Sequence, residues 1–76
     1  MKDVQTTVIS TEDFDDYIQI TEKIVCGKLK WLPTLIQQRQ DERKEEGYSL
    51  IEEKVRKVYC LTNFRYGTLL IFRKEK

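Results

Sequence analysis

The side chains that could do chemistry in this sequence are carboxylates, lysines, arginines, tyrosines and two cysteines, because histidine is absent. Without imidazole, the commonest general acid or base near neutral pH is missing, and so are histidine-based triads and metal sites. Cys26 and Cys60 stand singly and far apart, which is not a zinc-binding pattern. The three glycines are also single and form no phosphate-binding loop. We therefore expect no enzyme activity, no cofactor and no bound metal.

Basic residues concentrate at the C-terminal end of the chain. Residues 1–26 contain two basic and six acidic side chains, a net charge of −4, whereas residues 54–76 contain seven basic and one acidic, a net charge of +6. Cations can neutralise phosphates while neighbouring aromatic rings stack on unpaired bases. The candidate nucleic-acid-binding residues of this segment are Lys57, Tyr59, Arg65, Tyr66 and Arg73. The alternative is that the basic positions only neutralise the acidic end of the chain or protect an edge strand from aggregation.

A second candidate surface is the run QQRQDERKEEG, residues 37–47, which contains no apolar side chain. Its glutamine, arginine, glutamate and lysine residues favour a helix that is anchored at its start, solvated at its end and projects beyond the core. Arg39, Arg43 and Lys44 lie near one stripe of that helix. We expect them to bind a protein partner, because arginine grips carboxylates bidentately and the acidic neighbours disfavour phosphate. The alternative is that the run is a solvated spacer.

The elements that must position these residues follow from local patterns. The β-branched segment 4–9 predicts a strand. Residues 12–26 predict a helix, because capping residues precede them, apolar residues recur at helical spacing and Gly27 ends the pattern. Pro33 then opens a second predicted helix over about 33–46.

Two β-rich runs and a connecting loop are predicted at the C-terminal end, over 55–62, 68–74 and 63–67 respectively. Asn63 and Gly67 support the hairpin loop. A helix over about 49–59 competes with the first run, and we prefer the strand. The five-residue loop places Thr62 opposite Thr68.

Together these elements predict one small α+β domain over residues 1–76, in the order β-α-α-β-β. We expect a three-stranded antiparallel-type sheet with the C-terminal strand in the middle and two helices on one face. Trp31, beside the only proline, should anchor the junction between the helices. The run 69–72 is apolar on both faces of its strand, so the uncovered face should be closed by a partner or, most simply, by a homodimer.

The location follows from what the sequence lacks. No apolar stretch approaches the roughly 20 residues that span a bilayer, and the first residues lack the apolar core of a signal peptide. We expect a cytoplasmic protein that does not bind membranes and whose two cysteines stay reduced.

The strand–helix–helix–sheet order with a basic C-terminal sheet resembles small ribosome-dependent messenger-RNA-cleaving toxins. Members of that family can cut RNA with lysine, arginine and tyrosine in place of histidine, so the resemblance implies a toxin-like ribonuclease. The additional C-terminal strand of the family is missing here. Three classes of function therefore stay open: a protein-binding inhibitor or regulator, a nucleic-acid-binding domain, and the ribonuclease. We prefer the first, because catalytic chemistry is lacking and small charge-dense regulators are common in phages and other mobile elements.

Overall fold

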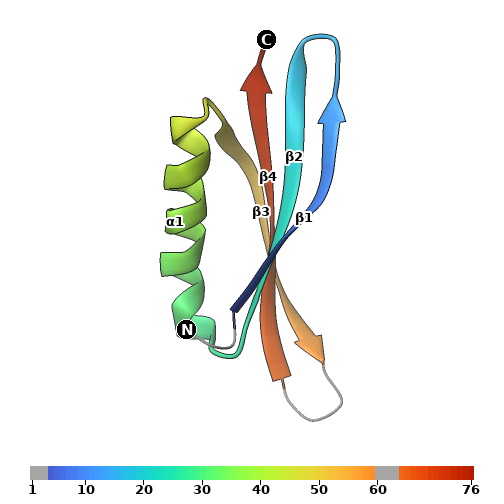
Figure 1. The fold of residues 1–76 in the computed structure, drawn as a ribbon. Coiled ribbons are helices and arrows are strands. Elements are labelled where there is room, and N and C mark those ends of the chain that lie inside the picture. The colour runs from blue at the N-terminus through green and yellow to red at the C-terminus, as the bar shows by residue number, and fades with distance from the viewer. Residues whose placement is uncertain (1–3, 60–63) are drawn as a thin grey trace.

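The computed structural model describes residues 4–59 and 64–76, and it gives the side chains of residues 4–54 and 65–76. Its elements follow one another as β1 (Val4–Asp13), β2 (Tyr17–Cys26), the 3-10 turn η1 (Leu29–Trp31), α1 (Leu32–Glu45), β3 (Ser49–Tyr59) and β4 (Phe64–Glu75). Figure 1 shows a long, twisted sheet with α1 along one side. The molecule is elongated and measures 43 × 21 × 17 Å along its principal axes.

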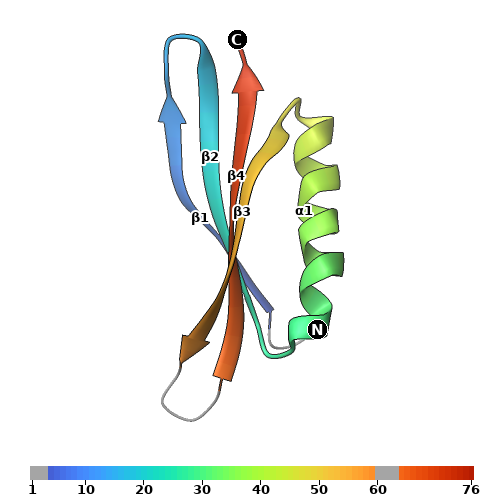
Figure 2. The same ribbon diagram turned by 180° about the vertical axis from the view of Figure 1, so that it is seen from behind.

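The strands form one antiparallel sheet in the order β1-β2-β4-β3. The C-terminal strand β4 therefore lies between two others, which confirms its predicted internal position. Figures 1 and 2 show that β1 comes near α1 only at its first residues, and that the β3–β4 hairpin extends past the start of the helix. The α+β class is confirmed, but the described residues form four strands and one α-helix where the sequence predicts three strands and two helices.

The predicted helix over 12–26 is wrong, because these residues end β1 and form all of β2. Every second residue of β2 from Ile20 to Cys26 is buried, which is the period of a strand. One of these buried positions is the charged residue Glu22, and it hides the alternation of apolar residues in the sequence. The element order is consequently β-β-α-β-β, which is not the order on which the resemblance to RNA-cleaving toxins rests.

The core lies between α1 and one face of the sheet. Leu32, Leu35 and Ile36 of α1 are buried against the inward side chains of β2 and β4. Those inward residues pair across the ladder as Ile20 with Phe72, Glu22 with Leu70, Ile24 with Thr68 and Cys26 with Tyr66. Because Phe72 and Leu70 are fully buried, their apolar surface supplies much of the free energy that holds the helix on the sheet.

The predicted helix over about 33–46 is confirmed as α1, with Pro33 in its first turn. The helix ends in a Schellman motif, in which the Tyr48 N–H donates to the Arg43 carbonyl oxygen at 2.9 Å. The Gly47 N–H donates to the Lys44 carbonyl oxygen at 3.0 Å, and Gly47 has a φ of +93°. This stop turns the chain directly into β3, so the second half of α1 lies along the sheet and does not project beyond the core as predicted.

The C-terminal hairpin is confirmed in kind but not in register. Residues 49–59 form β3, so the strand and not the competing helix is present. Thr68 pairs with Val55, whereas the sequence predicts Thr62, which lies outside the described residues. The predicted loop residue Gly67 is buried within β4 and pairs with β2 on one side and β3 on the other. A glycine inside a strand marks close packing of neighbouring backbones, and here it resembles a turn signal in the sequence.

Trp31 lies at the end of η1 and is half-buried against the core cluster. The Lys28 Nζ atom lies 5.3 Å from the centroid of the indole ring. The described residues contain no second α-helix, so the prediction that Trp31 joins two helices is wrong. It instead packs where the chain passes from β2 into α1.

Candidate interaction surface

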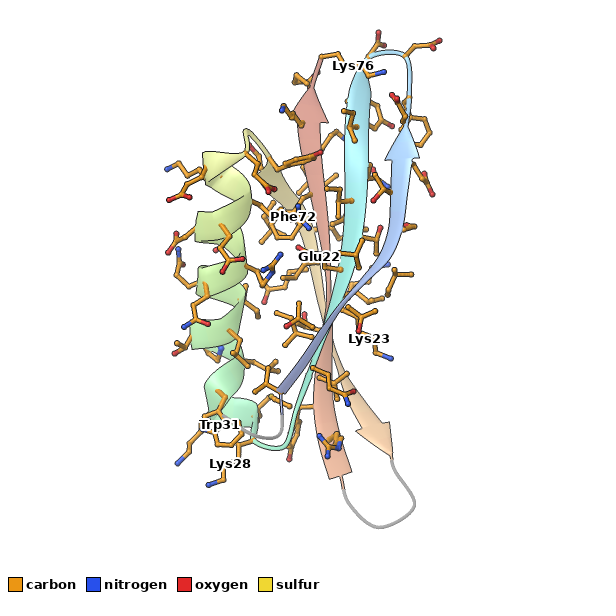
Figure 3. All side chains as sticks on the ribbon, in the orientation of Figure 1. Glu22, Lys23, Lys28, Trp31, Phe72 and Lys76 are labelled. Carbon is orange, nitrogen blue, oxygen red and sulfur yellow. The ribbon has the colours of Figure 1, made fainter. Side chains whose placement is uncertain are left out.

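A buried carboxylate on β2 binds two arginines of α1. Glu22 is 0% exposed, and Figure 3 shows it directed toward α1 while its neighbour Lys23 lies on the opposite side of the sheet. The Arg39 Nη2 atom donates to Glu22 Oε1 at 2.6 Å. Arg43 donates twice, from Nη2 to Oε1 at 3.1 Å and from Nε to Oε2 at 3.2 Å. Residues four apart lie on the same face of a helix, so both guanidinium groups reach one carboxylate.

The charges of this cluster are balanced at its solvent edge. Arg39 also pairs with Glu42, and Arg43 pairs with Glu46 at 2.7 Å. The hydrogen bond with Glu22 raises the pKa of Arg43 above its usual value, so its guanidinium stays charged. The Arg39 Nε atom is buried and finds no hydrogen-bond partner among the described residues. The cluster is therefore an ion network that fixes the helix to the sheet, and its arginines have little left to offer an external ligand.

The three predicted partner-binding residues consequently differ in their positions. The side chains of Arg39 and Arg43 are only 21% and 14% exposed, because both are turned toward Glu22. Lys44 is exposed. Sequence reasoning finds the basic stripe but misses Glu22, and the available signal is a lone carboxylate between Ile20 and Ile24 on a strand of period two.

Lys44 lines a surface hollow of about 330 Å³ between α1 and the start of β3. The hollow is lined by Gln37, Gln40, Asp41 and Lys44 from the helix and by Tyr48, Ser49 and Leu50 from the following segment. The Gln37 Nε2 atom donates to Asp41 Oδ1 at 2.9 Å. The Tyr48 ring lies 5.8 Å from the Arg43 guanidinium and 5.7 Å from Lys74 Nζ, measured from its centroid. Amides, both signs of charge and an aromatic ring thus meet at one open site.

The predicted nucleic-acid-binding residues do not form one patch in the part that the structure describes. Arg65 and Tyr66 are neighbours on β4 and therefore point to opposite faces of the sheet. Arg73 lies eight residues further along β4, roughly 26 Å away. It donates to Gln19 Oε1 at 3.0 Å, and its guanidinium carbon lies 4.1 Å from the Tyr17 ring centroid.

The side chains of the other two predicted residues, Lys57 and Tyr59, lie outside the described set. Their backbones pair with Tyr66 and Phe64 respectively. The structure therefore separates Arg73 from Arg65 and Tyr66, and nucleic-acid binding by Lys57 and Tyr59 stays a prediction.

The sheet face opposite α1 is partly apolar and bears charged residues at its margins. Leu69 and Ile71 of β4 are half-buried there, whereas Leu70 and Phe72 are covered by the helix. Lys23 pairs opposite Leu69 in the ladder, and the neighbouring strand β3 carries a Lys54–Glu52 ion pair with an N–O distance of 3.2 Å. The expectation that residues 69–72 are apolar on both faces is confirmed.

Among the described residues, the single α-helix has neither the length nor the apolar character needed to cross a membrane. Residues 4–59 and 64–76 also hold no group of three carboxylates, cysteines or histidines arranged to bind a metal ion. No protein-family model, curated protein or solved structure matches the chain.

Proposed function

We propose that this protein is a small non-enzymatic binding protein that acts by contact with another protein, as an inhibitor or regulator. The proposal rests on the hollow beside Lys44, because amide groups and side chains of both charges converge there around an aromatic ring. A lysine, an aspartate and two glutamine amides can together match the backbone and charged side chains of a polypeptide. Tyrosine is enriched at interface hot spots, which assigns Tyr48 the central contact.

A protein partner fits this surface better than a phosphate backbone. Asp41 lies in the hollow beside Lys44, and Glu42 and Glu45 are exposed on the same helix. Phosphates would be repelled by these carboxylates, whereas a polypeptide of mixed charge would be complemented by them. The cytoplasm is the proposed location, since the buried thiol of Cys26 is free and donates to the Lys28 carbonyl oxygen at 3.1 Å.

The proposal changes the roles of the predicted partner-binding residues. Lys44 keeps the role of a partner contact, together with Gln37 and Tyr48. Arg39 and Arg43 instead hold α1 in the position that forms the hollow, through Glu22. Substituting either arginine would therefore weaken partner binding by disturbing the fold, and neither is a clean probe of the interface.

The test uses Lys44→Glu, with Lys30→Glu as its control. Both lysines are exposed, but Lys30 lies in η1 and does not line the hollow. Immobilised wild-type protein and both variants would be used to capture proteins from an extract of the source cells, and a captured protein would then be titrated by calorimetry. We expect Lys44→Glu to weaken the affinity of each partner site at least tenfold, about 1.4 kcal/mol, and Lys30→Glu to leave that per-site affinity unchanged.

A complex that both variants weaken equally, or that neither weakens, would move the partner site away from the hollow. Recovery of RNA in place of a protein, seen as a high ratio of absorbance at 260 and 280 nm that falls after a high-salt wash, would favour the nucleic-acid alternative.

A further inference from the structure

The outer edge of β1 is built for pairing with another strand. β1 lies at one end of the strand order, so only β2 pairs with it among the described residues. Residues 4–11 carry no charge and are rich in valine, isoleucine and threonine. Most of their side chains are exposed, including 47% of Val8 and 52% of Ile9. A long, uncharged, β-branched edge presents unpaired backbone groups to any strand that approaches it.

The opposite edge of the sheet is protected, which singles out β1. The exposed residues Glu52, Glu53 and Lys54 follow one another on β3. Charged side chains on an edge strand disfavour edge-to-edge pairing. Both edges contain a bulge, after Val8 in β1 and after Leu50 in β3, so the bulges do not distinguish them. Charge distinguishes the two edges. The uncharged and regular segment Val4–Val8 is therefore the edge that is open to pairing.

We propose that two copies of this chain form a homodimer by antiparallel pairing of their Val4–Val8 segments, with the two-fold axis at Thr6. This register puts Thr6 opposite its own copy and Val4 opposite Val8 of the second copy, so apolar cross-strand pairs close both ends of the contact. The two sheets become one continuous sheet. A two-fold contact uses the same edge on both copies and is closed, so it ends at the dimer and does not build a filament.

Charge supports a second copy of this chain as the occupant of the edge. The end of the sheet at the β1–β2 turn has exposed Glu12, Asp15 and Asp16 beside an Asp13–Lys76 ion pair, whereas the opposite end carries exposed Lys28 and Lys30. Antiparallel pairing brings the acidic turn of each copy toward the lysine end of the other. Parallel pairing would instead place the two acidic turns together, where they would repel each other.

The arrangement leaves the proposed partner site open. The two-fold axis runs perpendicular to the sheet, so both copies of α1 lie on the same face of the joined sheet. The hollow beside Lys44 borders β3, the strand at the far edge from β1. A dimer would therefore present two partner sites at its outer ends and bind a repeated partner with higher avidity. The dimer does not depend on the proposed function, because its interface and the hollow share no residue.

The decisive variant is Thr6→Lys, with Ile51→Lys as its control. Both residues are exposed on an edge strand, but Ile51 lies on β3, at the edge of the sheet far from β1. At position 6 the two-fold axis places two like charges directly opposite each other, which destabilises a strand pair. In sedimentation equilibrium we expect wild type to dimerise with a dissociation constant on the order of 10 µM, since the contact is small. Thr6→Lys should raise that constant at least tenfold, and Ile51→Lys should leave it within about twofold.

A charge swap separates pairing from misfolding. Thr6→Glu alone should also be monomeric, but an equimolar mixture of Thr6→Lys and Thr6→Glu should form a heterodimer, because opposite charges then face each other. Circular dichroism of each variant would check that the sheet is intact. Wild type that stays monomeric up to about 1 mM, or a dimer that resists Thr6→Lys and is lost with Ile51→Lys on β3, would overturn the proposal.

Discussion

At the scale of single residues, the most consequential group is the carboxylate of Glu22. A fully buried charge is tolerated only when it is paired and hydrogen-bonded, and Glu22 receives three hydrogen bonds from two arginines. The network connects the middle of β2 to the second half of α1, where the helix has no buried apolar residue. The polar run of α1 is therefore fixed to the sheet by charge and not by a hydrophobic face.

This role predicts a large effect of Glu22→Gln. The amide keeps the shape of the side chain but removes its charge, which leaves the two guanidinium groups paired only with the exposed carboxylates of Glu42 and Glu46. Breaking a buried ion pair from one side costs about 3–5 kcal/mol. In urea unfolding we expect Glu22→Gln to lose about 3 kcal/mol or more of the free energy of unfolding, with α1 detached first.

Glu42→Gln is the matched control for that measurement. It makes the same chemical change in another partner of Arg39, but the Glu42 side chain is 64% exposed. An exposed pair contributes about 0–1 kcal/mol, so this variant should unfold close to wild type. Equal and small losses in the two variants would show that the buried network does not hold the helix.

At the scale of elements, the end of α1 depends on one backbone conformation. Gly47 has a φ of +93°, and an added Cβ atom would lie 3.2 Å from Lys74 Cε, the flexible end of a long side chain. The cost of a substitution is therefore set by the backbone and not by the contact. We expect Gly47→Ala to lower the free energy of unfolding by about 1–2 kcal/mol.

Gly47→Asn distinguishes this explanation from simple crowding. Asparagine is larger than alanine but adopts left-handed conformations more readily. It should therefore lower the free energy of unfolding less than alanine does, when wild type and both variants are compared by thermal unfolding. A greater loss with asparagine would mean that the space around Lys74 matters more than the backbone.

The elements differ in how far the sequence determines them, for a physical reason. α1 can be predicted from the sequence because its signals are local: Pro33 in the first turn, helix-forming residues and a terminal Gly47. The strand β2 cannot be predicted in the same way. Its alternation is broken by Glu22, and that residue becomes compatible with burial only through Arg39 and Arg43, which lie 17 and 21 positions later. Local periodicity cannot detect a charge that is compensated by a distant element.

The candidate surfaces can likewise be predicted where their signals are local, but not where they depend on distant elements. The basic stripe of Arg39, Arg43 and Lys44 is visible from helical spacing, but its split into two inward residues and one outward residue depends on the sheet beneath it. The separation of Arg73 from Arg65 depends on the observed extent of β4, which the predicted loop at 63–67 conceals. The predicted sheet, with its C-terminal strand in the middle, already places the strand over 4–9 at an edge, but the helix predicted over 12–26 hides the β2 partner and the full length of β1.

At the scale of the whole molecule, the fold is a thin structure with an unequal distribution of charge. One helix covers one face of the sheet, the two ends of the sheet differ in charge, and only one edge strand is charged along its middle. The proposed dimer brings the unlike ends together and removes the uncharged edges from water. Its stability should therefore have an electrostatic part, from the acidic turn and the lysine end, and a part from strand pairing that salt does not screen.

These two parts can be separated by ionic strength. The Debye length falls from about 10 Å at 0.1 M salt to about 3 Å at 1 M, so attraction between exposed charges is largely lost at high salt. Each exposed pair contributes about 0.2–1 kcal/mol, so we expect the dimer dissociation constant to rise roughly three- to tenfold over this range. Sedimentation equilibrium at the two salt concentrations would measure the change. The double variant Lys28→Gln with Lys30→Gln should already have the weaker constant at low salt and should respond little to added salt. If salt instead strengthens the wild-type dimer, the contact is apolar, and the antiparallel arrangement that joins the unlike ends loses its electrostatic support.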